Sequence, residues 1–257
     1  MVTHRSGPAR EYDVPKRQSP PPQVFVTGGT GYLGRRVIRA LLERGAEVTA
    51  LVRPNSDYED RLGPFLAQIE IVVGDACNLG SLNGRARGHF CVIHLVGGRG
   101  TDPARGLTNR HLNYTSTRTV AAMAMGDGVR RFVYLSSAGL PPTLSDFSDS
   151  KREAEKYLLR CGLEWLIIRA PRLVGGERRH TLLSYIMKPF RYAPLLNRLA
   201  PLPVGIAARG IAALALNAQA YERFYYGPDL RRLGRPPAQA PQPPPLQLPP
   251  GTYPPGR

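Results

Sequence analysis

The sequence predicts an α/β protein that is built on a doubly wound parallel sheet and carries a small C-terminal helical appendage. Short apolar segments of strand length alternate with longer amphipathic segments through most of the chain. Most of the short segments are apolar at consecutive positions, which is typical of strands that helices cover on both faces. A glycine-rich turn also joins the first strand to the first helix. In such a fold, ligands bind beyond the carboxyl ends of the strands.

The turn after the first strand carries the strongest functional signal. The run Val24-Phe25-Val26 leads into Thr-Gly-Gly-Thr-Gly-Tyr-Leu-Gly, in which Gly28, Gly31 and Gly34 have the spacing Gly-x-x-Gly-x-x-Gly. The first glycine permits a tight turn, the second lets the backbone approach a pyrophosphate, and the third lets the helix pack closely on the strand. The N-terminus of the helix would then face the phosphates. The motif predicts a Rossmann-like dinucleotide site, and the alternative is an ordinary tight turn between a strand and a helix.

The remaining elements follow from the apolar pattern. We expect strands at residues 47–52, 69–73, 91–96, 131–135 and 164–168, and helices at about 109–125 and 148–161. Past Pro171 the alternation stops, and we expect helices at 182–187 and 206–220 and a short strand at 223–226.

Composition divides the chain into four parts. Residues 1–22 and the Pro-rich residues 235–257 hold too little apolar surface to offset their ordering entropy, so we expect disordered tails. Residues 23–175 form the expected dinucleotide-binding domain, and residues 176–234 form a small substrate or lid region of the same domain. The second tail is also compatible with a polyproline ligand.

Charge and cysteine content restrict the classes of partner. The net charge is +16, but 31 of the 35 basic residues are arginines scattered over every segment, which argues against a nucleic-acid interface and leaves an acidic surface open. The three cysteines (Cys77, Cys91 and Cys161) show no metal-ligand spacing, and we expect no metal site. Cys91 and Cys161 lie in apolar runs, which predicts buried, reduced thiols in a cytoplasmic protein. We identify no secretory signal, and the apolar region 195–220 is too interrupted to span a bilayer.

The residues that follow each expected strand suggest how a dinucleotide is recognised. Arg53 follows the second strand, where an acidic residue would bind the ribose of NAD and an arginine suits the 2′-phosphate of NADP. Arg35 and Arg36 could assist Arg53, and the alternative is that Arg53 is a solvated loop residue. Asp75 follows the third strand, where its carboxylate could accept from the adenine amino group or cap the next helix.

The ends of the fourth and fifth strands face the other half of such a ligand. The small turn Val96-Gly97-Gly98 lets the backbone approach a ribose. Ser136 and Ser137 could hold a substrate carbonyl or simply cap a turn.

Taken in order, these segments resemble the short-chain dehydrogenase/reductase superfamily in its extended and atypical branches. The matching segments cover about residues 23–175, and they include 27–34, 51–53, 74–75, 92–97, Asn113, 129–137, 151–155 and 168–172. The resemblance implies a cofactor site made of Gly28, Thr30, Gly31, Tyr32, Leu33, Gly34, Arg53, Asp75, Ala76, Leu95, Val96, Gly97, Asn113, Ser136, Lys151 and Pro171. It implies NADP(H) as the favoured cofactor and NAD(H) as the alternative.

One departure from the family concerns catalysis. Members use a Tyr-x-x-x-Lys pair, in which the lysine holds the nicotinamide ribose and the tyrosine is the general acid or base. Here the run is Phe147-Ser148-Asp149-Ser150-Lys151, so Lys151 is present and phenylalanine occupies the tyrosine position. The resemblance gives Ser137, with Ser136 as the alternative, the hydroxyl position of the catalytic group, and it gives Lys151 the ribose position. Substitute proton donors would have to come from Tyr134, Tyr114, His94 or His111, although Tyr134 and His94 also fit packed core positions.

The short region after Pro171 implies a shallow or open substrate site. We therefore expect an NADP-preferring oxidoreductase or isomerase that acts on a small apolar or quinone-like substrate. The alternative is a non-catalytic protein that uses the dinucleotide as a structural or sensing ligand, as the NmrA-like sensors and the nucleotide-binding accessory subunit of respiratory complex I do. By analogy, the second hypothesis leaves peripheral association with a membrane complex open.

Overall fold

The computed structural model describes residues 20–98, 102, 107–139, 145–175 and 197–235. Residues 1–19, residues 236–257 and the expected helix at 182–187 lie outside the described residues. The boundaries of the four expected parts of the chain therefore stay predictions.

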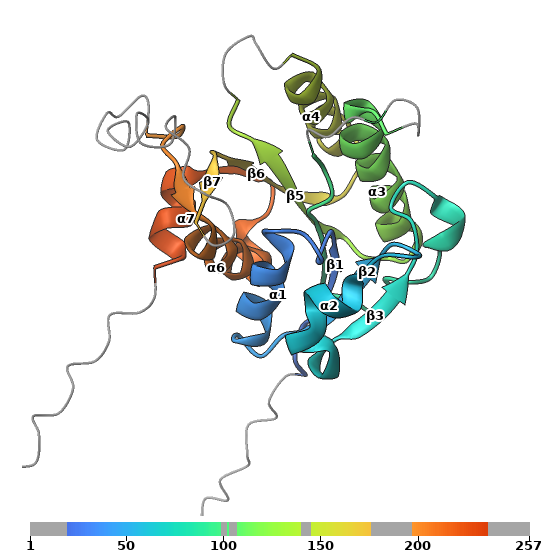
Figure 1. Ribbon diagram of the computed structural model, residues 1–257. Helices are drawn as coiled ribbons and strands as arrows, with labels where there is room; N and C mark the ends of the chain where they lie inside the picture. Colours follow the sequence, from blue (N-terminus) through green and yellow to red (C-terminus); the bar gives the residue numbers. More distant parts are fainter. Residues whose placement is uncertain (1–19, 99–101, 103–106, 140–144, 176–196, 236–257) are drawn as a thin grey trace, which may run out of the picture.

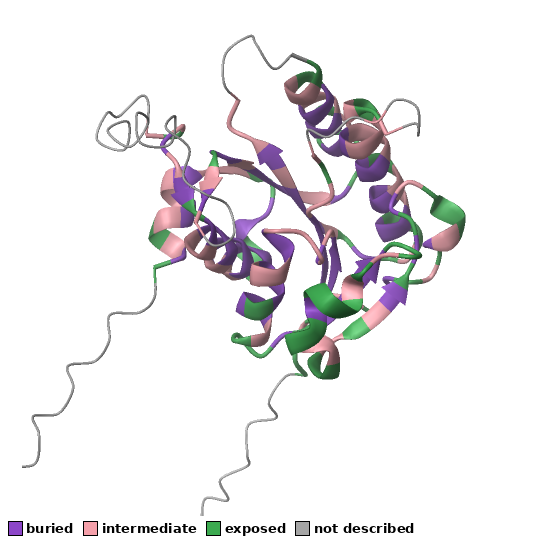
Figure 2. Cartoon of the chain, in the orientation of Figure 1, coloured by how far each residue is buried: buried purple, intermediate pink, exposed green. Residues whose placement is uncertain are grey.

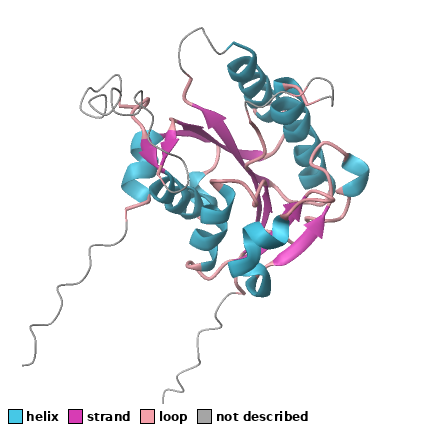
Figure 3. Cartoon of the chain, in the orientation of Figure 1, coloured by secondary structure: helices cyan, strands magenta, loops and turns pink. Residues whose placement is uncertain are grey.

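A seven-stranded parallel sheet forms the centre of the molecule (Figure 3). Its strands are β1 (Gln23–Thr27), β2 (Glu47–Val52), β3 (Glu70–Val73), β4 (Cys91–His94), β5 (Arg131–Ser137), β6 (Glu164–Ala170) and β9 (Arg223–Tyr226). Their order in the sheet is β3-β2-β1-β4-β5-β6-β9. The order reverses between β1 and β4, and this switch point is where open α/β sheets bind ligands. The predicted doubly wound fold is confirmed.

Helices cover both faces of this sheet (Figure 1). They are α1 (Gly34–Leu42), α2 (Tyr58–Leu62), α3 (Ser116–Gly126), α4 (Ser145–Leu158), α6 (Val204–Ala215) and α7 (Gly227–Leu233). Shorter helical turns are η1 (Gly63–Gln68), η2 (Leu79–Ser81), η4 (His111–Thr115) and η6 (Ala218–Ala220). The short strands β7 (Leu173–Val174) and β8 (Leu202–Pro203) pair with each other outside the main sheet.

Two apolar cores lie on opposite faces of the sheet, which is why its strands are buried along most of their length (Figure 2). Helices α1 and α6 pack on one face, where Ile38 and Ile211 are fully buried. Helices α3 and α4 pack on the other, where Val120 and Leu158 are fully buried. Burying each such side chain contributes about 1.5–3 kcal/mol relative to leaving it exposed.

The C-terminal region contributes to both layers of this fold. Helix α6 packs against α1 and α7, and β9 extends the main sheet as a parallel neighbour of β6. The expected strand at 223–226 is confirmed. The expected helix at 206–220 instead begins at Val204 and ends at Ala215, because the chain turns at Asn217, whose side chain accepts from the Gln219 amide.

Other boundaries differ by a few residues. The fourth strand ends at His94, so Leu95 and Val96 lie in the loop that follows it. The expected helix at 148–161 begins at Ser145 and ends at Leu158, which places Phe147 inside its first turns. The expectation of buried thiols holds for Cys91, whereas Cys161 lies beyond the end of α4 and is only half-buried.

Candidate functional site

The glycine turn between β1 and α1 adopts the geometry that its sequence predicts. Gly28 has φ +75°, and its carbonyl accepts from the Gly31 amide at 3.1 Å. A Cβ on Gly34 would lie 2.2 Å from the Gly28 carbonyl oxygen and 2.7 Å from the Gly29 Cα. Only glycine can therefore bring α1 this close to the turn. Helix α1 has no side-chain cap at Leu33, and the amides of Arg35, Arg36 and Val37 in its first turn donate to the carbonyls of Gly31 and Leu33. The helix therefore offers a phosphate mainly the positive end of its dipole.

The same turn lies directly against the loop that follows β4. A Cβ on Gly28 would lie 2.9 Å from the Leu95 carbonyl carbon and from the Val96 nitrogen. This contact brings two of the strand ends that the sequence analysis singled out to one place, the switch point between β1 and β4.

On the β2–β3 side, Arg53 and Asp75 are both exposed at strand ends. The Asp75 carboxylate accepts from the Cys77 amide at 2.9 Å and so caps the turn after β3. The alternative role, N-cap of the next helix, is wrong for this residue, because Asn78 is the N-cap of η2. Ala76 beside it is buried. Arg36 lies over the Tyr32 ring, 4.8 Å from its centroid, and donates to the Tyr32 carbonyl at 2.6 Å. Arg53 is thus the more accessible candidate for a 2′-phosphate.

At the other end of the site, three residues converge around a glycine. A Cβ on Gly97, whose φ is +150°, would lie 2.6 Å from both Asn113 Oδ1 and Lys151 Nζ. Asn113 comes from η4 and Lys151 from α4, and both side chains are buried. Asn113 Nδ2 donates to Ser150 Oγ at 3.0 Å, whereas Asn113 Oδ1 is a buried acceptor with no hydrogen-bond partner in the described part of the chain.

This arrangement fits a dinucleotide. An unsatisfied buried acceptor and a buried lysine flank a cradle that a single methyl group would fill. Ligand hydroxyl groups can both donate to a carbonyl oxygen and accept from an ammonium. Asn113, Lys151 and Gly97 would hold the ribose end, and Gly28 to Gly34 would hold the phosphates. The dinucleotide, when bound, would supply hydride chemistry.

Lys151 is held rigidly in this cradle. Its Nζ donates to the Leu135 carbonyl at 2.9 Å and lies 4.8 Å from the centroid of the Tyr134 ring. Burial lowers the pKa of the Lys151 ammonium to about 7, although the nearby Glu155 carboxylate acts in the opposite direction. The resulting amine is far less basic than an ordinary lysine.

The two serines at the end of β5 have different environments. Ser136 is buried, and its hydroxyl donates to the Glu155 carboxylate on α4. Ser137 is half-buried, and its hydroxyl accepts from the Gly139 amide at 3.3 Å. The Ser136 hydroxyl is therefore already hydrogen-bonded within the protein, and Ser137 is the better candidate for contact with a substrate.

Tyr134 and His94, two of the possible substitute proton donors, are core residues. Burial raises the pKa of the Tyr134 hydroxyl far above its ordinary value and lowers the pKa of His94 to about 3. His94 Nδ1 lies 2.7 Å from Thr27 Oγ1, and Nε2 lies 3.2 Å from Ser116 Oγ. Because the Ser116 hydroxyl donates to the Leu112 carbonyl, it accepts from His94 Nε2–H, and His94 is a neutral cross-link between β1, β4 and α3.

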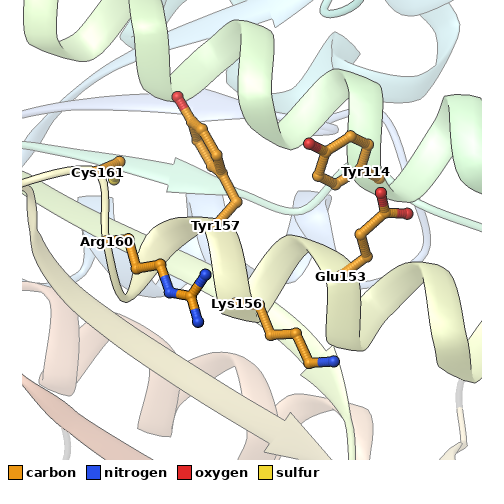
Figure 4. Close-up of a pocket in the computed structure, with 6 residues that line it drawn as sticks. All are labelled: Tyr114, Glu153, Lys156, Tyr157, Arg160 and Cys161. Carbon is orange, nitrogen blue, oxygen red and sulfur yellow. The ribbon is translucent and has the colours of Figure 1, made fainter.

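The other two candidates, Tyr114 and His111, lie on η4. Tyr114 lines a shallow hollow of about 300 Å³ on the outer face of η4 and α4 (Figure 4). The Tyr114 ring meets Tyr157 edge-on at 6.4 Å, and Arg110 lies over it at 4.6 Å. The His111 carbonyl lies 3.7 Å from Cys77 Sγ. No contact in the described residues links either side chain to Lys151.

A network of charged side chains around Glu155 lies beneath this site and was not predicted from the sequence. Glu155 is 3% exposed, and its carboxylate accepts from the Arg169 guanidinium at 2.7 and 3.2 Å and from Arg152 as well as Ser136. Arg152 also donates to the Ser137 carbonyl at 3.0 Å. The signal was present in the run Arg152-Glu153-Ala154-Glu155, because side chains three residues apart, such as those of Arg152 and Glu155, lie on the same side of a helix.

Two further contacts surround the site. The Tyr32 hydroxyl donates to the Gly175 carbonyl, which ties the glycine turn to the segment after β6. Pro171 is buried at the end of β6, where a Cβ on Gly227 would lie 3.0 Å from its ring. The structure therefore places the predicted cofactor residues along the carboxyl edge of the sheet, from β3 to β6.

Comparisons with known proteins point to the same class of ligand. A family model described as NAD(P)H-binding matches residues 28–191. The ceramide reductase of Caulobacter vibrioides is 33% identical over 162 residues, which are 62% of this chain and 49% of that protein. The photosystem II assembly factor Ycf39 of Synechocystis is 28% identical over 159 residues, which are 60% of this chain and 46% of that protein. The chain thus spans about half the length of these two curated relatives.

A solved structure shows the same fold. A double mutant of DesIV, a dTDP-glucose 4,6-dehydratase from Streptomyces venezuelae solved with NAD bound, superposes with a TM-score of 0.60 at 20% identity over 79% of this chain and 74% of the enzyme. In the part of the chain that the structure describes, no helix has the length and apolar character needed to cross a membrane.

Proposed function

The chain belongs to the NAD(P)H-binding family as an atypical short-chain dehydrogenase/reductase, and on that premise we propose that it is an NADP(H)-preferring oxidoreductase. Its substrate is a small apolar or quinone-like molecule. The observation that carries this proposal is the cradle of Gly97, Asn113 and Lys151, which is complete although Phe147 replaces the usual tyrosine. The relative called ceramide reductase supports a reductive activity in this family.

The absence of the usual acidic tyrosine indicates which hydride acceptors the site can reduce. Reducing a simple ketone requires protonation of the oxygen as hydride arrives, and general acid catalysis contributes about 10²–10⁴-fold to such a rate. A quinone-like ring or a conjugated double bond spreads the developing charge, so water can protonate the product after hydride transfer. A tyrosine-free site is therefore better matched to these acceptors than to simple ketones.

Cofactor preference is assigned to Arg53. A guanidinium suits a phosphate dianion because it donates two parallel hydrogen bonds in a fixed geometry. The exposed position of Arg53 after β2 supports the preference for NADP(H) over NAD(H).

A specific observation also favours a second function, in which the dinucleotide is a structural or sensing ligand. Of the hydroxyl and imidazole groups that the structure describes near Lys151, Tyr134 and His94 are buried in the core and Ser136 is bound to Glu155. The relative called a photosystem II assembly factor supports a role of this kind within the family.

One experiment separates these functions. The purified protein would be titrated calorimetrically with NADPH and with NADH, and NADPH oxidation would be followed by absorbance with a water-soluble quinone and with a simple ketone. We expect tighter binding of NADPH than of NADH, and turnover with the quinone only. Tight NADPH binding without turnover of any acceptor would support the sensing or structural role, and absence of binding would overturn both.

A further inference from the structure

The surroundings of the Lys151 side chain are poorly suited to a positive charge. The residue is 5% exposed, and its Nζ has the Leu135 carbonyl as its hydrogen-bond acceptor at 2.9 Å, with the Tyr134 ring beneath it. An ammonium carries three N–H donors, so one carbonyl and one ring face replace only part of its hydration. The protein groups around Nζ therefore stabilise the protonated form of this lysine only in part.

The groups that face Lys151 do not balance its charge. From β4, His94 is neutral, and from β5, Tyr134 keeps its proton. From η4, Asn113 presents an uncharged oxygen. From α4 itself, Glu155 is the nearest carboxylate, but it already binds two guanidinium groups, those of Arg152 and Arg169. Burial consequently dominates, and the pKa of Lys151 falls to about 7.

A bound dinucleotide would change this balance according to its redox state. The phosphates are anionic in both forms, but the nicotinamide ring is neutral in NADPH and carries a positive charge in NADP+. The family resemblance puts Lys151 at the ribose that bears this ring. The reduced ligand therefore favours a protonated Lys151, and the oxidised ligand opposes it.

We propose that Lys151 couples proton binding to the redox state of the dinucleotide. The protein takes up a proton at Lys151 when NADPH binds and takes up less when NADP+ binds. Lowering the pH therefore shifts the protein toward the reduced ligand, which makes the site a combined sensor of pH and of the NADPH/NADP+ ratio. This inference rests on the proposed cofactor binding, but it holds for both a catalytic and a sensing protein.

The size of the effect follows from linkage. Ribose hydroxyls that accept hydrogen bonds from the Lys151 ammonium favour its charged form, and the phosphates at the glycine turn add a weaker attraction over a longer distance. If NADPH raises the pKa of Lys151 by about one unit, its affinity falls about fivefold between about pH 7 and about pH 9. The affinity for NADP+ changes less over the same range. Well below the pKa of Lys151 in the free protein, which is about 7, Lys151 is protonated with and without NADPH. The affinity for NADPH therefore stops depending on pH there.

Calorimetry in two buffers of different ionisation enthalpy measures this proton uptake directly, without turnover. NADPH and NADP+ would each be titrated into the wild type, Lys151→Met and Lys156→Met at several pH values. Lys156 is an exposed lysine on the same helix and is the matched control. We expect uptake of a fraction of a proton with NADPH, less with NADP+, no uptake in Lys151→Met, and wild-type behaviour in Lys156→Met.

The possible failures are distinguishable. If NADPH binds to the wild type without proton uptake, or with the same uptake as NADP+, the coupling is refuted while the cofactor assignment stands. If NADPH does not bind, the proposed function falls and the coupling falls with it. If Lys151→Met does not fold, Lys151→Arg keeps a positive charge that does not titrate near neutrality, and it should bind NADPH with no uptake. Uptake equal to that of the wild type in Lys151→Arg would also overturn the proposal.

Discussion

Substituting alanine at Gly97 tests the cradle at the centre of the site. The new Cβ would lie 2.6 Å from Asn113 Oδ1 and 2.6 Å from Lys151 Nζ, where ordinary contacts begin near 3.4 Å. Both side chains would have to move away by almost an ångström. The backbone conformation adds strain, because φ is +150° at this position and side chains other than glycine rarely adopt it. We expect Gly97→Ala to weaken NADPH binding by at least about tenfold, since displacements of about 1 Å are costly in preorganised sites.

The cost in stability can be estimated from the same contacts. A residue held in a sparsely populated backbone region costs about 1–3 kcal/mol, and forcing two packed side chains aside adds about 1 kcal/mol. We therefore expect Gly97→Ala to lower the free energy of unfolding by about 2–4 kcal/mol. For a domain of this size, the melting temperature would fall by about 5–15 °C.

Gly45 provides the matched control. It lies in the turn after α1 with φ +73°, and a Cβ there would meet nothing within 4 Å. Gly45→Ala should lose about 1–2 kcal/mol through backbone strain alone and should bind NADPH as the wild type does. Both variants would be compared by thermal unfolding and by calorimetric titration with NADPH. Equal NADPH affinity of Gly97→Ala and the wild type would refute the placement of the ribose end at this cradle.

Four further predictions follow from the site. Arg53→Asp should reduce the ratio of NADPH affinity to NADH affinity by about tenfold or more, because a charged hydrogen bond of about 1.5–3 kcal/mol is lost. An unchanged affinity ratio in calorimetry would remove Arg53 from the site. Phe147→Tyr should raise NADPH-dependent reduction of a simple ketone by about 10²-fold, as measured by NADPH absorbance, and no gain over the wild type would count against a latent carbonyl-reducing site. Glu155→Gln should lower the free energy of unfolding in urea by about 2–4 kcal/mol, because it removes the buried carboxylate that pairs with the partly exposed Arg169. A loss below about 1 kcal/mol would contradict this reasoning. Because the pKa of Lys151 is lowered from 10.5 to about 7, the unfolded chain binds more protons between these values. Stability should therefore rise with pH across this range, by a total on the order of 5 kcal/mol. Lys151→Met should lack this rise in urea unfolding, and an equal rise in both proteins would exclude Lys151 as its source.

Local sequence was sufficient for the first half of the site. The glycine turn after β1 and the strands β2 and β9 lie where the apolar pattern predicts them. These features depend on neighbouring residues, because a tight turn, a strand and the start of a helix each extend over a few positions. The departure at Phe147 was also visible in the sequence, since it requires only the spacing to Lys151.

Other features depend on residues that are far apart in the chain. From the sequence, Ser136 and Ser137 were both possible contacts to a substrate carbonyl. Only the packing of α4 on β5 shows that the Ser136 hydroxyl donates to Glu155 and that Ser137 stays at the site. Likewise, only the folded turn after β3 shows that the Asp75 carboxylate accepts from the Cys77 amide and that Asn78 is the N-cap of the next helical turn. Such choices rest on the positions of competing partners, which no local pattern encodes.

The sequence alone therefore determined the fold class, the turn that would hold the phosphates and the absence of tyrosine at position 147. Each of these features depends only on residues that are close together in the chain. The tertiary structure decided which of these groups carry charge and which remain available. It buried Lys151 beside a single carbonyl, left Asn113 Oδ1 without a described partner, and engaged Glu155 with Arg169. Burial and the pairing of distant side chains set the energy of a charge in a protein, and both exist only once the chain has folded.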